Sequence, residues 1–350
     1  MTSPTIDADL GEALVDDEHD IAREIAALVR RQLEKTYPPD KRPVRRDAHP
    51  KAHGCVRAEF RVEDGLSPKL AHGVFVPGKT YRAWIRFSNS SGDPTRGDSK
   101  GDGRGMAIKL LDVPGEKLLS DERHAMTHDF VMINHPTFIV DDPRRYRWLI
   151  KLSNSESLLL RLLTPLAIGL RGALNARAIT ASTIASPLEA RYWSCTAYRL
   201  GNGEHKTAVK YSAKPQRAPS TQMPPDPAPN FLRDVMIQQL ATREVRFDFL
   251  VQPRTSSDMS VENSRIEWSE ADAPFHKVAT ITIPQQKFSS PAQEEFGDNL
   301  SFSPWHALAE HRPLGRVNRV RRVVYEELSK LRHELNHAPR SEPTGEEVFD

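Results

Sequence analysis

A tyrosine bracketed by arginines lies near the C-terminus, in the run HRPLGRVNRVRRVVYEELSKLR. Arg321 precedes Tyr325 by four residues and Arg332 follows it by seven, so a helix would carry all three side chains on one face. A guanidinium one turn away stabilises the charged form of a phenol, and a phenolate is a hard oxygen ligand suited to ferric iron. The second arginine would then be a counter-ion for a carboxylate. An arginine-rich helix is more commonly a solvated face or a nucleic-acid-binding patch.

The overall composition argues against nucleic-acid binding and against secretion. The net charge is only +2, from 49 basic and 47 acidic residues, so no global field attracts an anionic polymer. Two cysteines, Cys55 and Cys195, are too few for a disulfide framework, which favours a reducing compartment. The N-terminus is acidic and lacks the features of a signal peptide, and there is no uninterrupted apolar run of 18 residues. We therefore expect a cytoplasmic protein that does not contact membranes.

The elements that must position these residues are mostly strands. Residues 16–36 have acids first, bases last and apolar residues at helical spacing, which indicates an amphipathic helix packed on the main domain or on a second subunit. Helical spacing returns at 144–190 and in the segment that carries Tyr325. Many strands and few long helices predict an α+β fold, an antiparallel β-barrel with inserted and C-terminal helices. The predicted strands lie within residues 53–64, 79–91, 103–113, 129–140, 190–200, 207–215, 243–253 and 276–286.

The apolar segment SLLLRLLTPLAIGLRGALNARA, residues 157–178, has two interpretations. A segment of this kind is most often a buried helix, and we favour that interpretation. The alternative is a surface that lines an entrance for a lipid-like substrate or contacts a membrane.

Five segments in chain order resemble motifs of the haem catalases. RDAHPKAHG, residues 46–54, is similar to their distal histidine motif, and WIRFSNSSG, residues 84–92, is similar to their RFS strand. GRGMAIKLL (103–111) resembles RGFAxKF, and DFVMINHPTFIVDDPRRY (129–146) resembles NNTPxFFIRDPxxF. The C-terminal stripe reproduces the proximal R-x-x-x-Y-x-x-x-x-x-x-R spacing. One motif alone would be weak, but five in order from residue 46 to residue 332 make a strong resemblance. The chain length is closest to the compact catalase-like haem proteins, a group that includes fatty-acid hydroperoxide dehydratases and lyases.

The resemblance implies an eight-stranded barrel and a bound haem b, iron protoporphyrin IX. It implies that Tyr325 ligates the iron, that His49 moves the proton of a bound peroxide, and that Asn134 orients the peroxide. The cofactor contacts that it implies are Arg46, Arg86, Tyr146, Arg321 and Arg332.

Two positions depart from the family pattern. Catalases have the functional asparagine at the first position of an NN pair, where this chain has Ile133. Asn134 would reach that place through a one-residue bulge, and otherwise it would cap a turn before His-Pro. Tyr146 stands where the family has a phenylalanine near the haem face. His53, four residues after His49, is expected to be structural.

We therefore predict an N-terminal arm with the amphipathic helix (1–43), a haem-binding domain (44–340) and a flexible acidic tail (341–350). The predicted function is catalase or peroxidase activity on a small-molecule peroxide. We expect no nucleic-acid partner, and both a monomer and a homo-oligomer are compatible with the sequence. The alternatives are a dehydratase or lyase of fatty-acid hydroperoxides on the same haem, and a haem-binding protein without activity. Ala48 has no hydroxyl to bind the His49 imidazole, which favours the catalase-like alternative.

Overall fold

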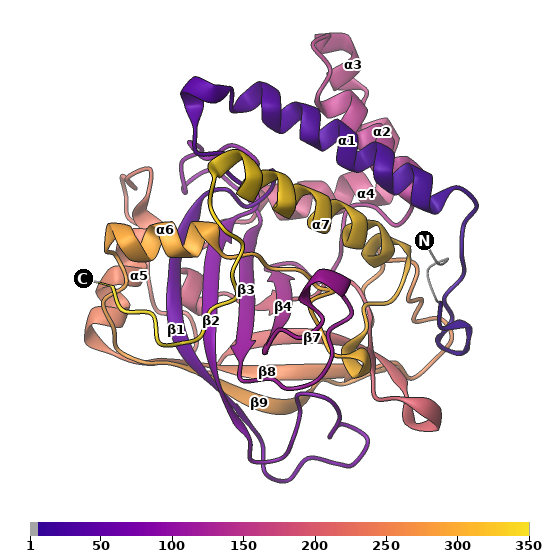
Figure 1. Ribbon diagram of the computed structural model, residues 1–350, viewed down its shortest axis with the longest axis vertical. Helices are drawn as coiled ribbons and strands as arrows, with labels where there is room; N and C mark the ends of the chain where they lie inside the picture. The colour runs from indigo at the N-terminus through magenta and orange to yellow at the C-terminus, as the bar shows by residue number, and fades with distance from the viewer. Residues whose placement is uncertain (1–5, 350) are drawn as a thin grey trace.

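A closed antiparallel β-barrel forms the centre of the computed structural model, which describes residues 6–349 (Figure 1). The hydrogen-bonded order is β5-β4-β3-β2-β1-β9-β8-β7, and β5 also pairs with β7, so eight strands close the barrel while β6 extends the sheet from β7. The eight-stranded barrel expected from the sequence is confirmed. The strands are β1 (Ala52–Val62), β2 (Thr80–Asn89), β3 (Arg104–Leu111), β4 (Thr127–Ile133), β5 (Tyr192–Trp193), β6 (Tyr198–Leu200), β7 (Thr207–Pro215), β8 (Val245–Pro253) and β9 (His276–Ile283).

Aromatic side chains fill the inside of the barrel. Alternate residues of each strand point inward, and the ring of Phe130 lies 4.8 Å from that of Phe249 and 5.1 Å from that of Tyr211. Phe60 adds an edge-to-face contact with Phe249 at 5.0 Å. These rings are almost fully buried, so the interior is a packed core. A ligand site must therefore lie outside the barrel wall.

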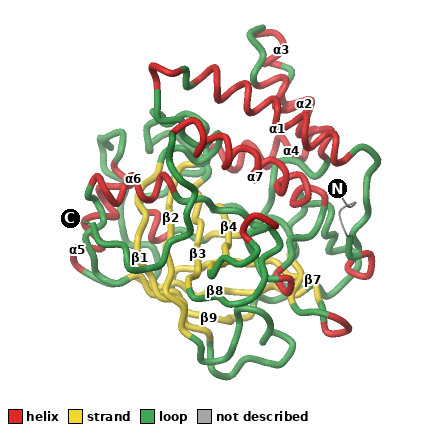
Figure 2. Tube along the Cα trace, in the orientation of Figure 1, coloured by secondary structure: helices red, strands yellow, loops and turns green. Residues whose placement is uncertain are grey.

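Helices gather along one side of the barrel. Figure 2 shows α1, α2, α3, α4 and α7 together above the strands, while α5 and α6 lie beside β1. The helices predicted at the N-terminus and around Tyr325 are confirmed as α1 and α7. The helices are α1 (Glu18–Thr36), α2 (Pro143–Ser153), α3 (Leu158–Leu162), α4 (Thr164–Ala181), α5 (Phe231–Thr242), α6 (Pro291–Asn299) and α7 (Arg316–Asn336).

Helix α7 lies between α1 and the barrel (Figure 1). Apolar residues at three- and four-residue spacing on both helices form one buried cluster, because that spacing places them on one face of each helix. The neighbouring face of α7, which carries Arg321 and Tyr325, is then turned toward the barrel wall. The cluster includes Ile21, Ile25, Val29 and Leu33 of α1 with Val320, Val324, Leu328 and Leu331 of α7.

Both chain ends contact the barrel domain. Near the N-terminus, Glu12 accepts a hydrogen bond of 2.6 Å from Arg319 at the start of α7. After α7, Glu342 accepts a hydrogen bond of 2.6 Å from Lys109 of β3, and Glu347 accepts one of 3.2 Å from the Trp84 indole of β2. The division of the chain into arm, domain and tail stays a prediction.

The apolar segment at 157–178 is not buried, and the interpretation we favoured for it is wrong. It forms α3 and α4, in which Leu159, Leu166 and Leu170 are 76, 74 and 80% exposed. Only a narrow face of α4 packs inward, through Ile168, Gly172 and Ile179, so the leucines on its other faces remain outside. Leu158–Ala181 is the one helical stretch in the described part of the chain that is long and apolar enough to span a bilayer.

Candidate functional site

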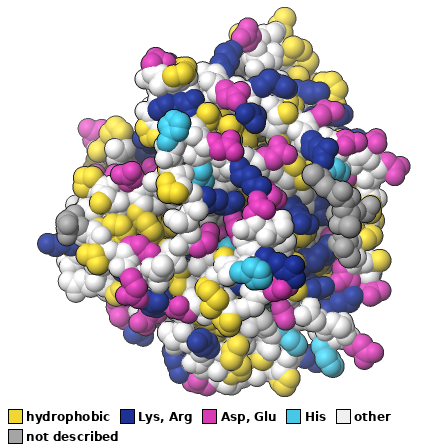
Figure 3. All heavy atoms as spheres, in the orientation of Figure 1, with side chains coloured by type: hydrophobic (Ala, Val, Ile, Leu, Met, Phe, Trp, Pro, Cys, Tyr) yellow, Lys and Arg dark blue, Asp and Glu magenta, His cyan; other side chains and the backbone are white. Residues whose placement is uncertain are grey.

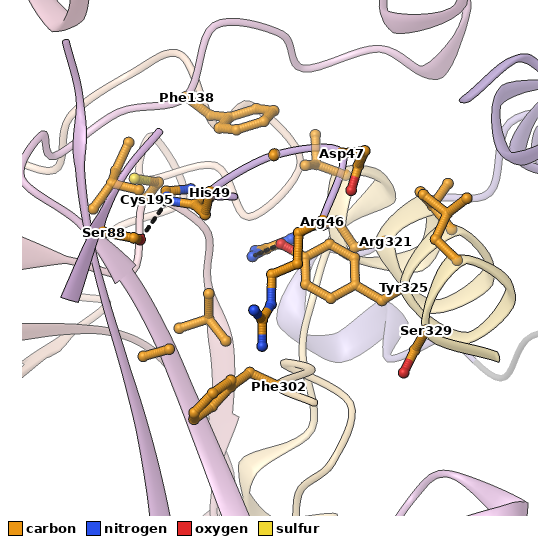
Figure 4. Close-up of a pocket in the computed structure, with 18 of the residues that line it drawn as sticks. Arg46, Asp47, His49, Ser88, Phe138, Cys195, Phe302, Arg321, Tyr325 and Ser329 are labelled. Atoms are coloured by element: carbon orange, nitrogen blue, oxygen red, sulfur yellow. Dashed lines mark hydrogen bonds between the residues drawn. The ribbon is translucent and has the colours of Figure 1, made fainter. Parts of the chain in front are cut away.

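A cavity lies between the outer wall of the barrel, α7 and the segment that precedes β1 (Figure 4). It contains about 1560 Å³ of space not filled by protein atoms, part of which opens to solvent. Strands β2, β3 and β4 supply one wall, and residues of α7 supply another. Among the residues predicted from the sequence, the cavity is lined by Arg46, His49, Arg86, Tyr146, Arg321, Tyr325 and Arg332.

Tyr325 is paired with the arginine one helical turn before it. Nη2 of Arg321 donates a hydrogen bond of 3.0 Å to the phenolic oxygen, and Nη1 donates one of 3.2 Å to Asn318. Burial lowers the pKa of Arg321, but the phenols of Tyr325 and Tyr198 outweigh burial and raise the pKa above its ordinary value. The guanidinium therefore remains charged and stabilises negative charge on the Tyr325 oxygen.

His49 lines the cavity on the side away from Tyr325 (Figure 4). Its backbone has a φ of 60°, a left-handed conformation that costs a non-glycine residue roughly 1–2 kcal/mol. Nη1 of Arg86 donates a hydrogen bond of 3.0 Å to the His49 carbonyl and so holds this conformation. The imidazole is held by Ser88, whose hydroxyl oxygen lies 3.0 Å from Nδ1.

Burial and positive neighbours keep the His49 imidazole neutral. Burial, followed by the charges of Arg86 and Arg321, lowers the pKa of His49 from 6.5 to about 3. In the tautomer in which Nδ1–H donates to Ser88, Nε2 has a free lone pair. A neutral imidazole of this kind can accept a proton and return it.

Three arginines converge on the C-terminal end of α6. Nη1 of Arg46 lies 3.6 Å from an oxygen of Asp298, and Nη2 of Arg86 lies 3.3 Å from the same oxygen. Arg332 donates hydrogen bonds of 2.6 and 3.1 Å to the carbonyl oxygens of Asp298 and Leu300. Burial and the charge of Arg86 lower the pKa of Arg332 to about 10. In addition, the buried Nε of Arg86 has no hydrogen-bond partner. Two of the three guanidinium groups share the Asp298 carboxylate and the third contacts only backbone carbonyls and neutral side chains, which leaves a positive excess that suits an anionic ligand.

Comparisons with known proteins identify relatives of the chain and solved structures with the same fold. No protein-family model matches the chain. A catalase-related peroxidase of Mycolicibacterium paratuberculosis is 29% identical over 283 residues, which cover 78% of this chain and 85% of the relative. Catalase A of Saccharomyces cerevisiae superimposes with a TM-score of 0.64 at 17% identity, covering 100% of this chain and 72% of the yeast chain. The chain has the fold of the catalases.

Further solved structures share the fold at similarly low identity. A fungal catalase superimposes with a TM-score of 0.62 at 18% identity and covers 89% of this chain, and a bacterial catalase gives 0.61 at 16% over 99%. The chain spans 64% of the length of the fungal catalase and 69% of the length of the bacterial one.

Asn134 does not line the cavity. Its side-chain oxygen accepts a hydrogen bond of 2.6 Å from the Arg104 backbone, and its amide nitrogen donates one of 3.1 Å to Ser182. The β3–β4 pairing is regular up to Ile133, and the bulge that would turn Asn134 toward the cavity is not seen in this described stretch. Ile133 lines the cavity in its place.

Three site residues were missed by the sequence reasoning. Ser88 lies two residues after Arg86 on β2, and strand alternation puts both on one face, so the signal was present. Gly105 allows the imidazole to lie against β3, since a Cβ there would be 2.6 Å from His49 Nδ1. No sequence pattern indicated Asp298, because its contact with the arginines exists only once α6 packs beside them. His53 is structural as expected, with a 2.9 Å hydrogen bond to Asn89.

Proposed function

We propose that the protein is a haem-b enzyme that cleaves the O–O bond of a peroxide, with catalase-like or peroxidase-like activity. The observation that carries the proposal is one cavity in which the Arg321–Tyr325 pair faces a neutral histidine. The cluster of three arginines in the same cavity supports it. The catalase-related peroxidase that resembles the chain also supports it, by its name.

The residues present fit a haem. The phenolic oxygen of Tyr325 is a suitable ligand for ferric iron, and Arg321 stabilises its negative charge. The haem propionates would lie next to Arg46, Arg86 and Arg332. The buried Nε of Arg86 has no hydrogen-bond acceptor there, and a propionate oxygen would supply one. When bound, the haem iron supplies the site that holds the peroxide and exchanges electrons with it.

In this proposal, His49 moves the proton. Nε2 accepts the proton of the peroxide and returns it to the departing oxygen, a transfer worth roughly 10²–10⁴-fold in rate. Ser88 fixes the ring for this transfer through the 3.0 Å hydrogen bond to Nδ1. The proposal gives Asn134 no contact with the peroxide, because Arg104 and Ser182 occupy its amide.

Absorption spectra and oxygen release test the proposal. The purified protein, supplied with haem, should show a Soret band and release oxygen from hydrogen peroxide or oxidise a peroxidase dye. Tyr325→Phe should lose the Soret band, whereas His49→Ala should keep the band and lose about 10²-fold or more of the turnover. His124→Ala removes an exposed histidine and should change neither. Full turnover in His49→Ala, or the absence of haem binding, would refute the proposal.

A second candidate is the conversion of a fatty-acid hydroperoxide on the same haem. The exposed leucines of α3 and α4 favour it, because they offer an apolar surface to a lipid-like substrate. Turnover of a fatty-acid hydroperoxide that exceeds turnover of hydrogen peroxide would select this candidate. Haem binding without either activity would leave a haem-binding protein.

A further inference from the structure

Eight exposed leucines lie close together in the sequence of α3 and α4, and we call the surface that they form the leucine patch. Their exposure ranges from 43 to 80%, whereas soluble proteins seldom leave so many large apolar side chains together in solvent. Helix α3 stands at one end of the molecule's longest axis (Figure 1), and in Figure 3 yellow apolar spheres are exposed at that end beside polar and charged ones. The patch consists of Leu158, Leu159, Leu160, Leu162, Leu163, Leu166, Leu170 and Leu174.

Part of the patch is one face of α4. Gly169 has a non-helical backbone that kinks the helix after Leu166, and Leu170 and Leu174, which are four residues apart, lie on one side of the helix beyond the kink. On the other side, Asn175 donates a hydrogen bond of 3.0 Å to the carbonyl of Phe138, and Gly172 lies so close to the carbonyl of Ile139 that a Cβ would be 2.6 Å away. These backbone contacts fix α4 along the surface. The segment therefore presents a face to its surroundings and does not span a bilayer.

Basic residues outnumber acidic ones in the segment that carries the leucine patch. Between residues 143 and 181 there are seven arginines and lysines and one glutamate, although the net charge of the whole chain is only +2. Arg144, Arg145, Lys151, Arg171 and Arg177 are exposed. An exposed tryptophan, Trp148, adds a side chain on α2 that is typical of the boundary between water and lipid. Leucines flanked by basic residues are the pattern of helices that lie in the surface of an anionic membrane.

We propose that the leucine patch docks the protein on an anionic lipid bilayer, with α3 and α4 lying in the plane of the membrane surface. A second copy of the chain fits the patch less well, because a two-fold contact would bring two positively charged rims together. The basic residues and the exposed leucines together favour anionic lipid as the binding partner. The proposal does not depend on haem or on peroxide chemistry, since it concerns only the outer face of α3 and α4.

Flotation with vesicles tests the docking directly. The full chain should float with vesicles made of equal parts phosphatidylcholine and phosphatidylglycerol, float less with phosphatidylcholine alone, and be released in part by salt. Leu166→Ser/Leu170→Ser/Leu174→Ser should weaken binding about tenfold or more. Val76→Ser/Met126→Ser, which changes exposed apolar residues elsewhere, should bind as the natural chain does. Arg171→Glu/Arg177→Glu should lose the preference for phosphatidylglycerol.

A fluorescent label reports which surface touches the lipid. Leu166→Cys places a reactive thiol on the patch, and the natural cysteines Cys55 and Cys195 are buried. An environment-sensitive dye on residue 166 should shift to the blue when the vesicles are added. The same dye on Val76→Cys should not shift.

Two results would overturn the proposal. One is the absence of flotation with phosphatidylglycerol vesicles, or flotation that the triple serine variant retains in full while its circular dichroism matches that of the natural chain. The other is self-association in light scattering that the triple serine variant abolishes, together with no shift of the dye at residue 166. That second result would assign the patch to a contact between copies.

Discussion

Gly105→Ala is the sharpest single test of how the barrel positions His49. The new Cβ would lie 2.6 Å from Nδ1 of His49 and 2.8 Å from the Ser88 hydroxyl oxygen, whereas ordinary contacts begin near 3.4 Å. Relief requires the ring to move by up to about 0.8 Å, the difference between 3.4 and 2.6 Å. A movement of that size lengthens the 3.0 Å hydrogen bond to Ser88 and takes Nε2 out of reach of its proton.

The expected loss of turnover is about 10²-fold, or about 3 kcal/mol of activation free energy, because displacements near 1 Å have effects of that order. The assay is steady-state peroxide turnover, with the Soret band as a measure of retained haem. The matched control is Gly65→Ala, since a Cβ at residue 65 meets nothing within 4 Å. Normal turnover in Gly105→Ala, with the haem spectrum unchanged, would show that the position of the imidazole does not govern the reaction.

Two further predictions concern buried charge. Asp298→Asn removes the carboxylate next to Arg46 and Arg86 and should destabilise the cofactor-free protein by about 1 kcal/mol; thermal unfolding with and without haem should show the loss shrinking when propionates are present. Burial raises the pKa of Glu342 but Lys109 outweighs it, so the pKa falls from 4.5 to about 2. A depressed carboxyl pKa stabilises the fold fully above pH 4.5, and the contribution is lost as the pH falls toward 2. Lys109→Met should remove this acid dependence and cost about 3–5 kcal/mol in urea unfolding at neutral pH; an unchanged urea midpoint would contradict the assignment.

Local spacing made much of the fold and of the site predictable. The Arg321–Tyr325 contact follows from helical geometry alone, since residues four apart meet on a helix. The strands were predictable because alternation and turn residues are recorded in the chain itself. The closure of eight strands came from the resemblance to the catalases, since no local pattern specifies that β5 pairs with β7.

Local sequence patterns do not predict which distant segments touch, or which of two neighbouring side chains faces the cavity. Asn134 and Ile133 are neighbours, and a shift of one position decides which of them faces the cavity; Ile133 lines it and Asn134 does not. The contact of Arg46 and Arg332 with α6 depends on a helix that no motif indicated. The exposure of α3 and α4 was equally hidden, because an apolar sequence has the same appearance whether protein or lipid covers it.

The place of α7 between α1 and the barrel has a consequence for how long a ligand stays bound. Tyr325 lies close to one chain end, and the helix that covers α7 comes from the other end. Detachment of α1 and α7 from the barrel would therefore widen the cavity while the strands remain paired. Such local opening is governed by its own free energy, which is smaller than that of global unfolding. Ligand residence time and barrel stability should accordingly respond to different substitutions, the first to the α1–α7 contact and the second to the aromatic core.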